Sequence, residues 1–416
     1  MQPQINKPTL IDRVALGILG LIIINPYRSL FHVDVGNAMV SVEEFSIIAL
    51  ISVAVTGTLM KRSAPRLPVA AALMLLVAVS IAGIQLSRMI YGSTGAEVNH
   101  GRFFLPLLAA IVVCCCSWRL SAEVVARCIV LFTAASAAIA VCVHLFARDS
   151  LAILVGEIDA VEIAQHSGRM LWHRADVAVL ALALQSAIPW KSGIRWIAMA
   201  IILVGVICTQ NRSMVAACSA VLATTWCLSD RGYRAALSRT MILVLAVAIA
   251  LFASASEHEL DVVLHRFFVS DSSSEFDRSF VRGRLPYYEQ YVDKLGASPI
   301  LGHGLGTALA QLPDGQAIYG ADISLIGIAI PFGLLGVVLL WLLGAVCWSR
   351  ATSAKFGIRL SQAVHLAILV GVVLALNVDV WIRNCFVVAL AFVVACESAN
   401  GAGAVGGDKP KQAATR

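Results

Sequence analysis

The sequence predicts an all-α integral membrane protein with about twelve transmembrane helices. Of its 416 residues, 59% are hydrophobic and only 13% are charged, and the mean hydropathy is +0.84. Soluble globular domains carry about 25% charged residues. In addition, apolar runs long enough to cross a hydrocarbon layer about 30 Å thick recur along the chain. These observations exclude a soluble globular domain.

The apolar runs are separated by polar links, most of them short. We expect helices near residues 10–25, 43–60, 67–87, 103–118, 122–147, 173–190, 194–210, 212–229, 237–255, 321–348, 360–377 and 380–397. The first run also fits the core of a signal peptide. No small-residue cleavage site follows it, so we interpret it as a transmembrane helix.

The spans divide the chain into four parts. Residues 1–255 carry the first nine helices, and 256–320 form a long outer loop with an interfacial helix and an arginine cluster. Residues 321–397 carry the last three helices. Residues 398–416, rich in Gly, Ala and Lys, are expected to be a disordered cytoplasmic tail.

The distribution of charge predicts that both termini are cytoplasmic. Lys and Arg concentrate in short cytoplasmic loops. With cytoplasmic termini, more than half of the 31 Lys and Arg residues fall on that side, and most of the 25 Asp and Glu residues fall outside. The net charge of +6 therefore reflects topology, and nucleic-acid binding is not expected.

No metal or cofactor site is expected. The 11 cysteines lie almost entirely within expected spans and form no CxxC pair, so we interpret them as small packing residues. His166 and His173 are too far apart, and have no acid between them, to suggest a metal site.

The long outer loop gathers polar residues just before a hydrophobic span. Pro286 suits the first turn of a helix in which Tyr287, Tyr291 and Leu295 share one face. We expect this amphipathic helix to lie along the outer interface. An arginine cluster beside its free N-terminal amides fits a phosphate, with a solvated basic face as the alternative. The cluster comprises Arg278, Arg282 and Arg284.

The glycine-rich segment ASPILGHGLGT follows this helix. Gly302, Gly304 and Gly306 predict a close-packed turn, with His303 between the first two. The segment follows no strand and lacks the GxGxxG spacing, so it does not predict a dinucleotide site.

The tenth span has polar and helix-breaking residues. Asp322 stands at its entrance, and Pro331 and Gly333 lie near its middle. Because proline removes a backbone donor, we expect a kink and a carbonyl that neighbouring groups must satisfy.

Three further arginines lie at the outer ends of spans. Arg212 sits in the tight link QNRS, where its charge should face protein or a water-filled cavity; an ordinary polar turn is the alternative. Arg102 opens the fourth span as a snorkelling anchor or a ligand for an anion. Arg169, in QHSGRMLWHRAD, is a candidate for binding a substrate headgroup; the alternative is an interfacial loop anchored by Trp172.

These motifs occur in a recognisable order. TQNRSMVAACSA and RGRLPYYEQYVDKLGASPILGHGLG resemble motifs of the O-antigen ligase and polymerase superfamily. HSGRMLWHRADVAVLALAL is similar to the stretch before a middle span in those proteins, and IAIPFGLLG is similar to their closing glycine motif. The resemblance covers about residues 165–340.

The resemblance implies a multi-spanning GT-C type glycosyltransferase in the bacterial inner membrane, active at the periplasmic face. Such enzymes transfer a glycan from undecaprenyl pyrophosphate to an acceptor hydroxyl. Arg212 and Arg284 match the family arginines that hold the pyrophosphate, and Arg282 would assist them. Tyr287 and Tyr288 would flank the sugar or the lipid. The partners implied are the lipid-linked donor, an acceptor glycan or lipid A core, membrane lipids and a chain-length regulator protein.

One departure from the family pattern concerns the base. Ligases usually place a His-Asn pair before the span with the glycine motif, whereas this chain reads Ala-Asp-Ile-Ser-Leu at 321–325. Either Asp322 or His303 would then take the acceptor proton in a metal-independent, inverting transfer. The missing histidine favours a polymerase of repeat units over a lipid A core ligase or a protein glycan transferase.

A transporter or flippase for a polyprenyl-linked sugar is the alternative from another class. Its number of spans fits. Carriers often have paired repeats, and the two halves of this chain show no internal similarity. Ionisable residues gather at the outer face, with Arg127, expected to snorkel inward, as the nearest exception.

Overall fold

The computed structural model describes residues 9–26, 32–35, 38–61, 67–91, 105–115, 121–147, 170–172, 175–187, 192–209, 212–228, 231–253, 292–304, 329–340, 342 and 391. The labelled helices are α1 (Leu10–Ile24), α2 (Val42–Lys61), α3 (Leu67–Tyr91), α4 (Leu105–Cys115), α5 (Ala122–Phe146), α8 (Ala175–Ala187), α9 (Ser192–Cys208), α10 (Arg212–Leu228) and α11 (Arg231–Ala253). Helical segments also occur at 292–297 and 329–340.

The first nine expected spans each contain one of these helices. The tenth span is described over 329–340 and 342, and the last two lie outside the described residues apart from 391. Among the described helices, Leu73–Ile90 and Ala122–Phe146 are long and apolar enough to cross a membrane; shorter apolar segments include Ala175–Gln185 and Gly193–Cys208. The helical architecture is compatible with the expected membrane protein.

A short β-hairpin, which was not expected from the sequence, joins the helices. Strand β1 (His32–Val35) pairs antiparallel with β2 (Ala38–Ser41), with Val35 opposite Ala38. This register leaves a two-residue connection whose sequence is Gly-Asn, a pair that favours the tight turns of hairpins. Each strand is only four residues long, too short to stand out beside the membrane-length apolar runs.

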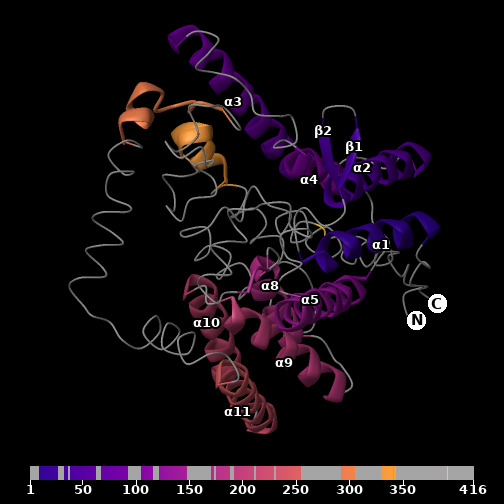
Figure 1. Ribbon diagram of the computed structural model, residues 1–416. Coiled ribbons are helices and arrows are strands. Elements are labelled where there is room, and N and C mark those ends of the chain that lie inside the picture. The colour runs from indigo at the N-terminus through magenta and orange to yellow at the C-terminus, as the bar shows by residue number, and fades with distance from the viewer. Residues whose placement is uncertain are drawn as a thin grey trace, which may run out of the picture.

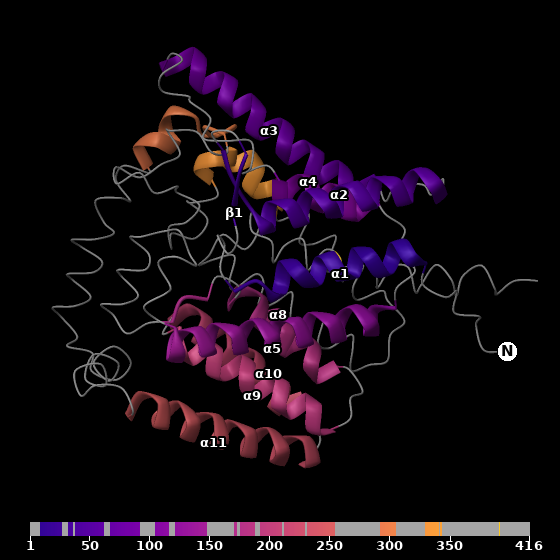
Figure 2. The ribbon, with the colours of Figure 1, turned by 45° about the vertical axis from the view of Figure 1, so that its right-hand side comes forward.

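The helices form successive layers (Figures 1 and 2). Helix α1 packs against both α2 and α5, α2 packs against α4, and α4 packs against α3. On the other side of α1, α5 packs against α8 and α9, and α11 covers α9. The segments 292–304 and 329–340 lie beside α3, far from α11 (Figure 2). Helix α1 is therefore an integral part of the packed core.

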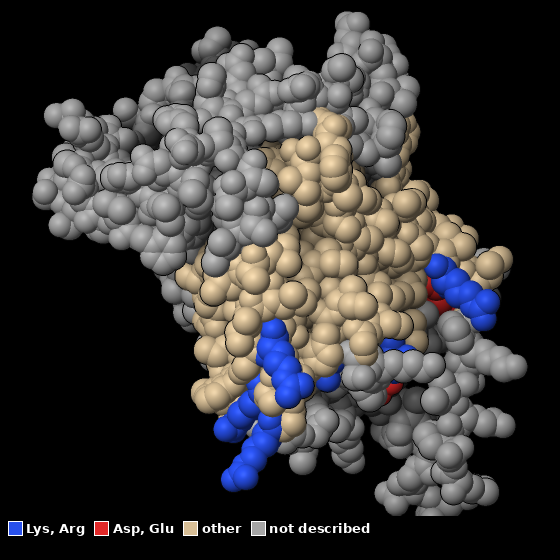
Figure 3. Space-filling view, turned by 60° about the horizontal axis from the view of Figure 1, so that its bottom comes forward, with Lys and Arg blue, Asp and Glu red and all other residues tan. Residues whose placement is uncertain are grey.

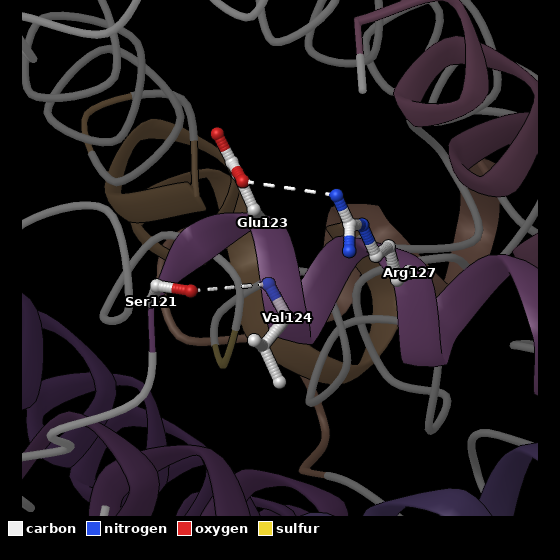
Figure 4. A network of polar contacts seen from close by, with 4 residues as sticks. All are labelled: Ser121, Glu123, Val124 and Arg127. Carbon is white, nitrogen blue, oxygen red and sulfur yellow. Dashed lines mark hydrogen bonds and ion pairs between the residues drawn. The ribbon is translucent and has the colours of Figure 1, made fainter. Parts of the chain in front are cut away.

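Helix α5 is central to this arrangement, and its start is well defined (Figure 4). The Ser121 hydroxyl caps the helix by accepting from the Val124 N–H at 3.3 Å. One turn further along, the Arg127 guanidinium lies 3.9 Å from the Glu123 carboxylate, and both side chains are about half exposed. Arg127 thus has a local acidic partner at the rim of the bundle.

Trp172 is buried between helices, which corrects its interpretation as an interfacial anchor. It is 5% exposed, and its indole N–H donates to the Ser136 hydroxyl on α5 at 3.0 Å. A Cβ on Gly205 of α9 would come within 3.1 Å of the indole ring, so glycine makes room for it. Small residues commonly allow membrane helices to approach closely. Here they create the space that an indole fills.

We expect Trp172→Phe to destabilise the protein because it removes the indole N–H and leaves the buried Ser136 without this donor. The loss should be about 1 kcal/mol or more in the free energy of unfolding. Thermal unfolding of the purified protein in detergent measures it. The matched control is Trp226→Phe, because Trp226 is 45% exposed. Equal stability of the two variants would contradict the structural role of Trp172.

Candidate functional site

The glycine-rich turn and the tenth span exchange backbone hydrogen bonds. In an uninterrupted helix, Leu334 and Leu335 would donate to the carbonyls of Ile330 and Pro331. Instead, the N–H groups of Leu334 and Leu335 donate to Pro299 and Ile300, at 2.9 and 3.2 Å. The released carbonyls of Ile330 and Pro331 accept from His303 and Gly304, at 2.7 and 2.9 Å. The turn therefore occupies an opening in the helical hydrogen-bond ladder.

Glycines make this exchange possible. Gly302, Gly304 and Gly333 have φ angles of 67°, 87° and 64°, a region that side chains disfavour. A Cβ on Gly302 would overlap the backbone of the tenth span, and a Cβ on Gly333 would overlap the Ile300 carbonyl. The span is disrupted at Gly333, whereas the carbonyl that Pro331 would leave without a donor belongs to Gly327, outside the described residues.

Helix α3 also packs against this glycine-rich turn. A Cβ on Gly83 would lie 2.9 Å from backbone atoms of both Gly302 and Gly304. A Cβ on Gly304 would in turn overlap Ile84 and the Ser80 carbonyl. We call this contact the glycine junction, and it consists of Gly83, Gly302, Gly304 and Gly333.

His303 is held inside the junction. Its side chain is 0% exposed, and its Nε2 lies 2.7 Å from the Lys294 carbonyl. A carbonyl can only accept, so Nε2 carries a proton and donates it to Lys294. The Ser87 hydroxyl lies 3.1 Å from Nδ1 and 3.4 Å from the His303 carbonyl. Because both ring nitrogens are engaged and buried, His303 is placed to hold α3 against the turn. Asp322, the other base expected from the sequence, lies outside the described residues.

The environment of His303 also keeps its ring neutral. Burial lowers the pKa of His303, and the positive charge of Lys294 lowers it further, although the hydrogen bond to the Lys294 carbonyl acts in the opposite direction. Partial burial likewise lowers the pKa of the Lys294 ammonium. The junction is thus built around an uncharged imidazole.

The starts of two helices meet at the end of α9. Met170, which precedes α8, donates its backbone N–H to the Cys208 carbonyl at the end of α9 at 3.0 Å. Helix α10 begins shortly after Cys208, at Arg212, and packs against α8. The N-termini of α8 and α10 therefore lie at one end of the bundle, where their partial positive charges favour an anion.

Asp176 is a buried polar residue at this place that sequence reasoning missed. It is 7% exposed in the first turn of α8, and its Oδ1 accepts from the Val177 N–H at 2.9 Å. Its Oδ2 has no hydrogen-bond partner among the described residues. Acids are common in the first turn of a helix because they complement its dipole, so the sequence alone does not distinguish Asp176.

The other expected site residues fall outside the part of the chain that the structure describes. Of the arginines, Arg212 is placed as the first residue of α10. Gly304 and Ala329 are the described residues that flank the segment with Asp322. The expected site residues outside the described ranges are Arg102, Arg169, Arg282, Arg284, Tyr287, Tyr288 and Asp322.

The comparison with protein families bears on this region. Residues 197–341 match the family model described as O-antigen ligase. The match covers 145 of the 416 residues. The resemblance to the O-antigen ligase and polymerase superfamily is thereby confirmed. No curated protein matches the chain.

The O-antigen ligase family match begins within α9 and ends just beyond 329–340, so it contains both Arg212 and three glycines of the junction. Gly83 and Ser87 on α3 lie outside it. The family supports a membrane protein of polysaccharide biosynthesis that acts on glycan and lipid-linked substrates.

We expect Gly333→Ala to open the junction. An alanine at this φ costs about 1–2 kcal/mol in strain, and its Cβ would also overlap the Ile300 carbonyl. Hydrogen exchange at the amides of His303, Gly304, Leu334 and Leu335 should become faster together. Gly17→Ala is the matched control, because a Cβ there meets nothing within 4 Å. Unchanged protection of these four amides would contradict the exchange.

We expect the stability of the protein to fall as the pH drops below about 6.5. Because the pKa of His303 is lowered on folding, the unfolded chain binds its proton first, so acidification favours unfolding between about 6.5 and the lowered pKa. Thermal unfolding at pH 7.5 and 5.5 measures the change. His303→Gln should be less stable at pH 7.5 and lose less stability at pH 5.5. An equal loss in both proteins would contradict this origin.

Proposed function

We propose that this membrane protein is a glycosyltransferase that joins glycan repeat units carried on undecaprenyl pyrophosphate at the periplasmic face of the bacterial inner membrane. The observation that supports it most is the family match over residues 197–341, which includes Arg212 and the junction that flanks Asp322. A polymerase is the favoured reading, and ligation of glycan to lipid A core is the alternative. The absence of the ligase His-Asn pair favours polymerisation.

In the proposed reaction, an acceptor hydroxyl attacks the anomeric carbon of the donor glycan. The glycosidic oxygen leaves with the diphosphate, and the hydroxyl proton passes to a base. Asp322 is the proposed base. Negative charge builds on the leaving diphosphate, and Arg212, Arg282 and Arg284 would stabilise it without a metal. Attack from the face opposite the leaving group gives inversion.

The donor would bind where the starts of α8 and α10 meet. Two helix N-termini and the guanidinium of Arg212 suit a diphosphate. Tyr287 and Tyr288 would flank the sugar or the lipid, and Arg102 and Arg169 would supply outer contacts.

Asp176 supports the presence of a cation at the same place. A buried carboxylate is costly unless it is paired or hydrogen-bonded. In the sequence, Arg169 precedes Met170 and Arg174 precedes Ala175, the first residue of α8, while Arg212 is the first residue of α10. In the proposal, one of these guanidiniums lies between Asp176 and the diphosphate, and the carboxylate fixes its orientation.

We expect Arg212→Ala and Arg284→Ala each to lower product formation about a hundredfold or more, because a donor to the developing charge is lost. Lysine at either position should restore little activity, since the forked geometry of the guanidinium is missing. Glycan profiles of cells that lack this chain and carry each variant measure the effect. Arg127→Ala is the control, because Arg127 pairs with Glu123 at the rim.

The same profiles distinguish the reactions. Single repeat units on the carrier or surface lipid, with long chains missing, support a polymerase. Long chains that remain on the carrier and fail to reach the final acceptor support the ligase. Normal glycans in cells that lack this chain, or in either alanine variant, would overturn the proposed site.

A further inference from the structure

Aromatic rings hold two arginines at the end of the bundle opposite the start of α10. The Arg195 guanidinium on α9 lies 4.2 Å from the ring centroid of Tyr233 on α11. The Arg234 guanidinium on α11 lies 5.1 Å from the ring of Trp226 on α10. These contacts bring together the start of α9, the end of α10 and the start of α11. Stacking fixes the guanidinium planes, and the Arg234 Nη2 also donates to the Cys227 carbonyl at the end of α10 at 2.9 Å.

Two more arginines extend this group. Arg231 and Arg239 are exposed on α11, and we call Arg195, Arg231, Arg234 and Arg239 the arginine patch. The sequences of α9, α10 and α11 contain no Asp or Glu. The linking residues Lys191 and Asp230 cancel each other in charge.

The described surface shows the same contrast. One group of Lys and Arg side chains lies at the lower left of this face without acidic side chains beside it, a second lies at the right next to acidic side chains, and the described surface between them is largely uncharged (Figure 3). The exposed apolar side chains on this part of the bundle include Ile194 and Ile197 on α9 and Ile242, Leu243 and Leu245 on α11. Helices α9 and α11 pack together, so the exposed apolar side chains at the start of α9 lie on a helix next to those that follow Arg239 on α11. In a membrane, these side chains would face acyl chains.

We propose that the arginine patch binds the phosphate headgroup of an anionic phospholipid whose acyl chains lie along α9 and α11. A phospholipid matches both the cationic end and the exposed apolar side chains on α9 and α11, whereas an acidic protein would match only the charge. Topology accounts for arginines at a cytoplasmic boundary. It does not require that two of them be stacked on rings within a group of helices that lacks acids. This site lies away from Arg212 and is independent of glycosyl transfer.

The test is binding of phosphatidylglycerol to the purified full-length protein in detergent, measured by native mass spectrometry. Phosphatidylcholine with the same acyl chains is the neutral comparison. We expect the protein to prefer phosphatidylglycerol and the preference to weaken as salt is raised. The double variant Arg231→Gln with Arg239→Gln should weaken phosphatidylglycerol binding about 25-fold, or about fivefold for each arginine near the membrane surface.

Arg127→Gln is the matched control, because Arg127 is also an exposed boundary arginine but has Glu123 as a partner. It should leave phosphatidylglycerol binding unchanged. Equal affinity of the wild type for the two lipids would overturn the proposal even if the double variant failed to fold. Equal losses in the double variant and in Arg127→Gln would also overturn it, because they would indicate only a general effect of surface charge.

Discussion

The exchange of backbone hydrogen bonds at the glycine junction constrains the whole region around it. Unpaired backbone groups are costly in a membrane protein, so the ladder of a spanning helix opens only where other groups replace the lost bonds. Here the turn at 299–304 supplies both donors and acceptors for 330–335. Without the other segment, each would have backbone groups that lack these hydrogen bonds. Helix α3 completes the contact through Gly83 and through the hydrogen bond between Ser87 and His303.

The helices were predictable because a membrane span has a simple physical requirement, an apolar run of sufficient length. The bounds of α1 and α5 agree closely with the expected runs. The close-packed turn was also predictable from Gly302 and Gly304. Its partner was not, because the hydrogen bonds join residues far apart in sequence and depend on the conformation of Gly333.

Burial explains why the site was harder to predict. His303 resembles a candidate base in the sequence, and its buried contacts with Ser87 and Lys294 come from tertiary packing that the sequence does not show. Trp172 resembles an interfacial anchor, but Gly205 and Ser136 create space for it inside the bundle. The sequence placed Arg212 at the start of a span, as found, and gave no reason to single out Asp176. Asp176 stands out only because tertiary packing buries its carboxylate.

The junction also fastens both ends of residues 305–328, since Gly304 and Pro331 are joined by a hydrogen bond. Closing a longer loop costs little, about 0.6 kcal/mol for each doubling of its length. Because this cost depends so weakly on length, a change in the number of residues between the two ends would leave the hydrogen bonds of the junction in place. The helices around the junction are thus insulated from variation in the length of the chain that it closes.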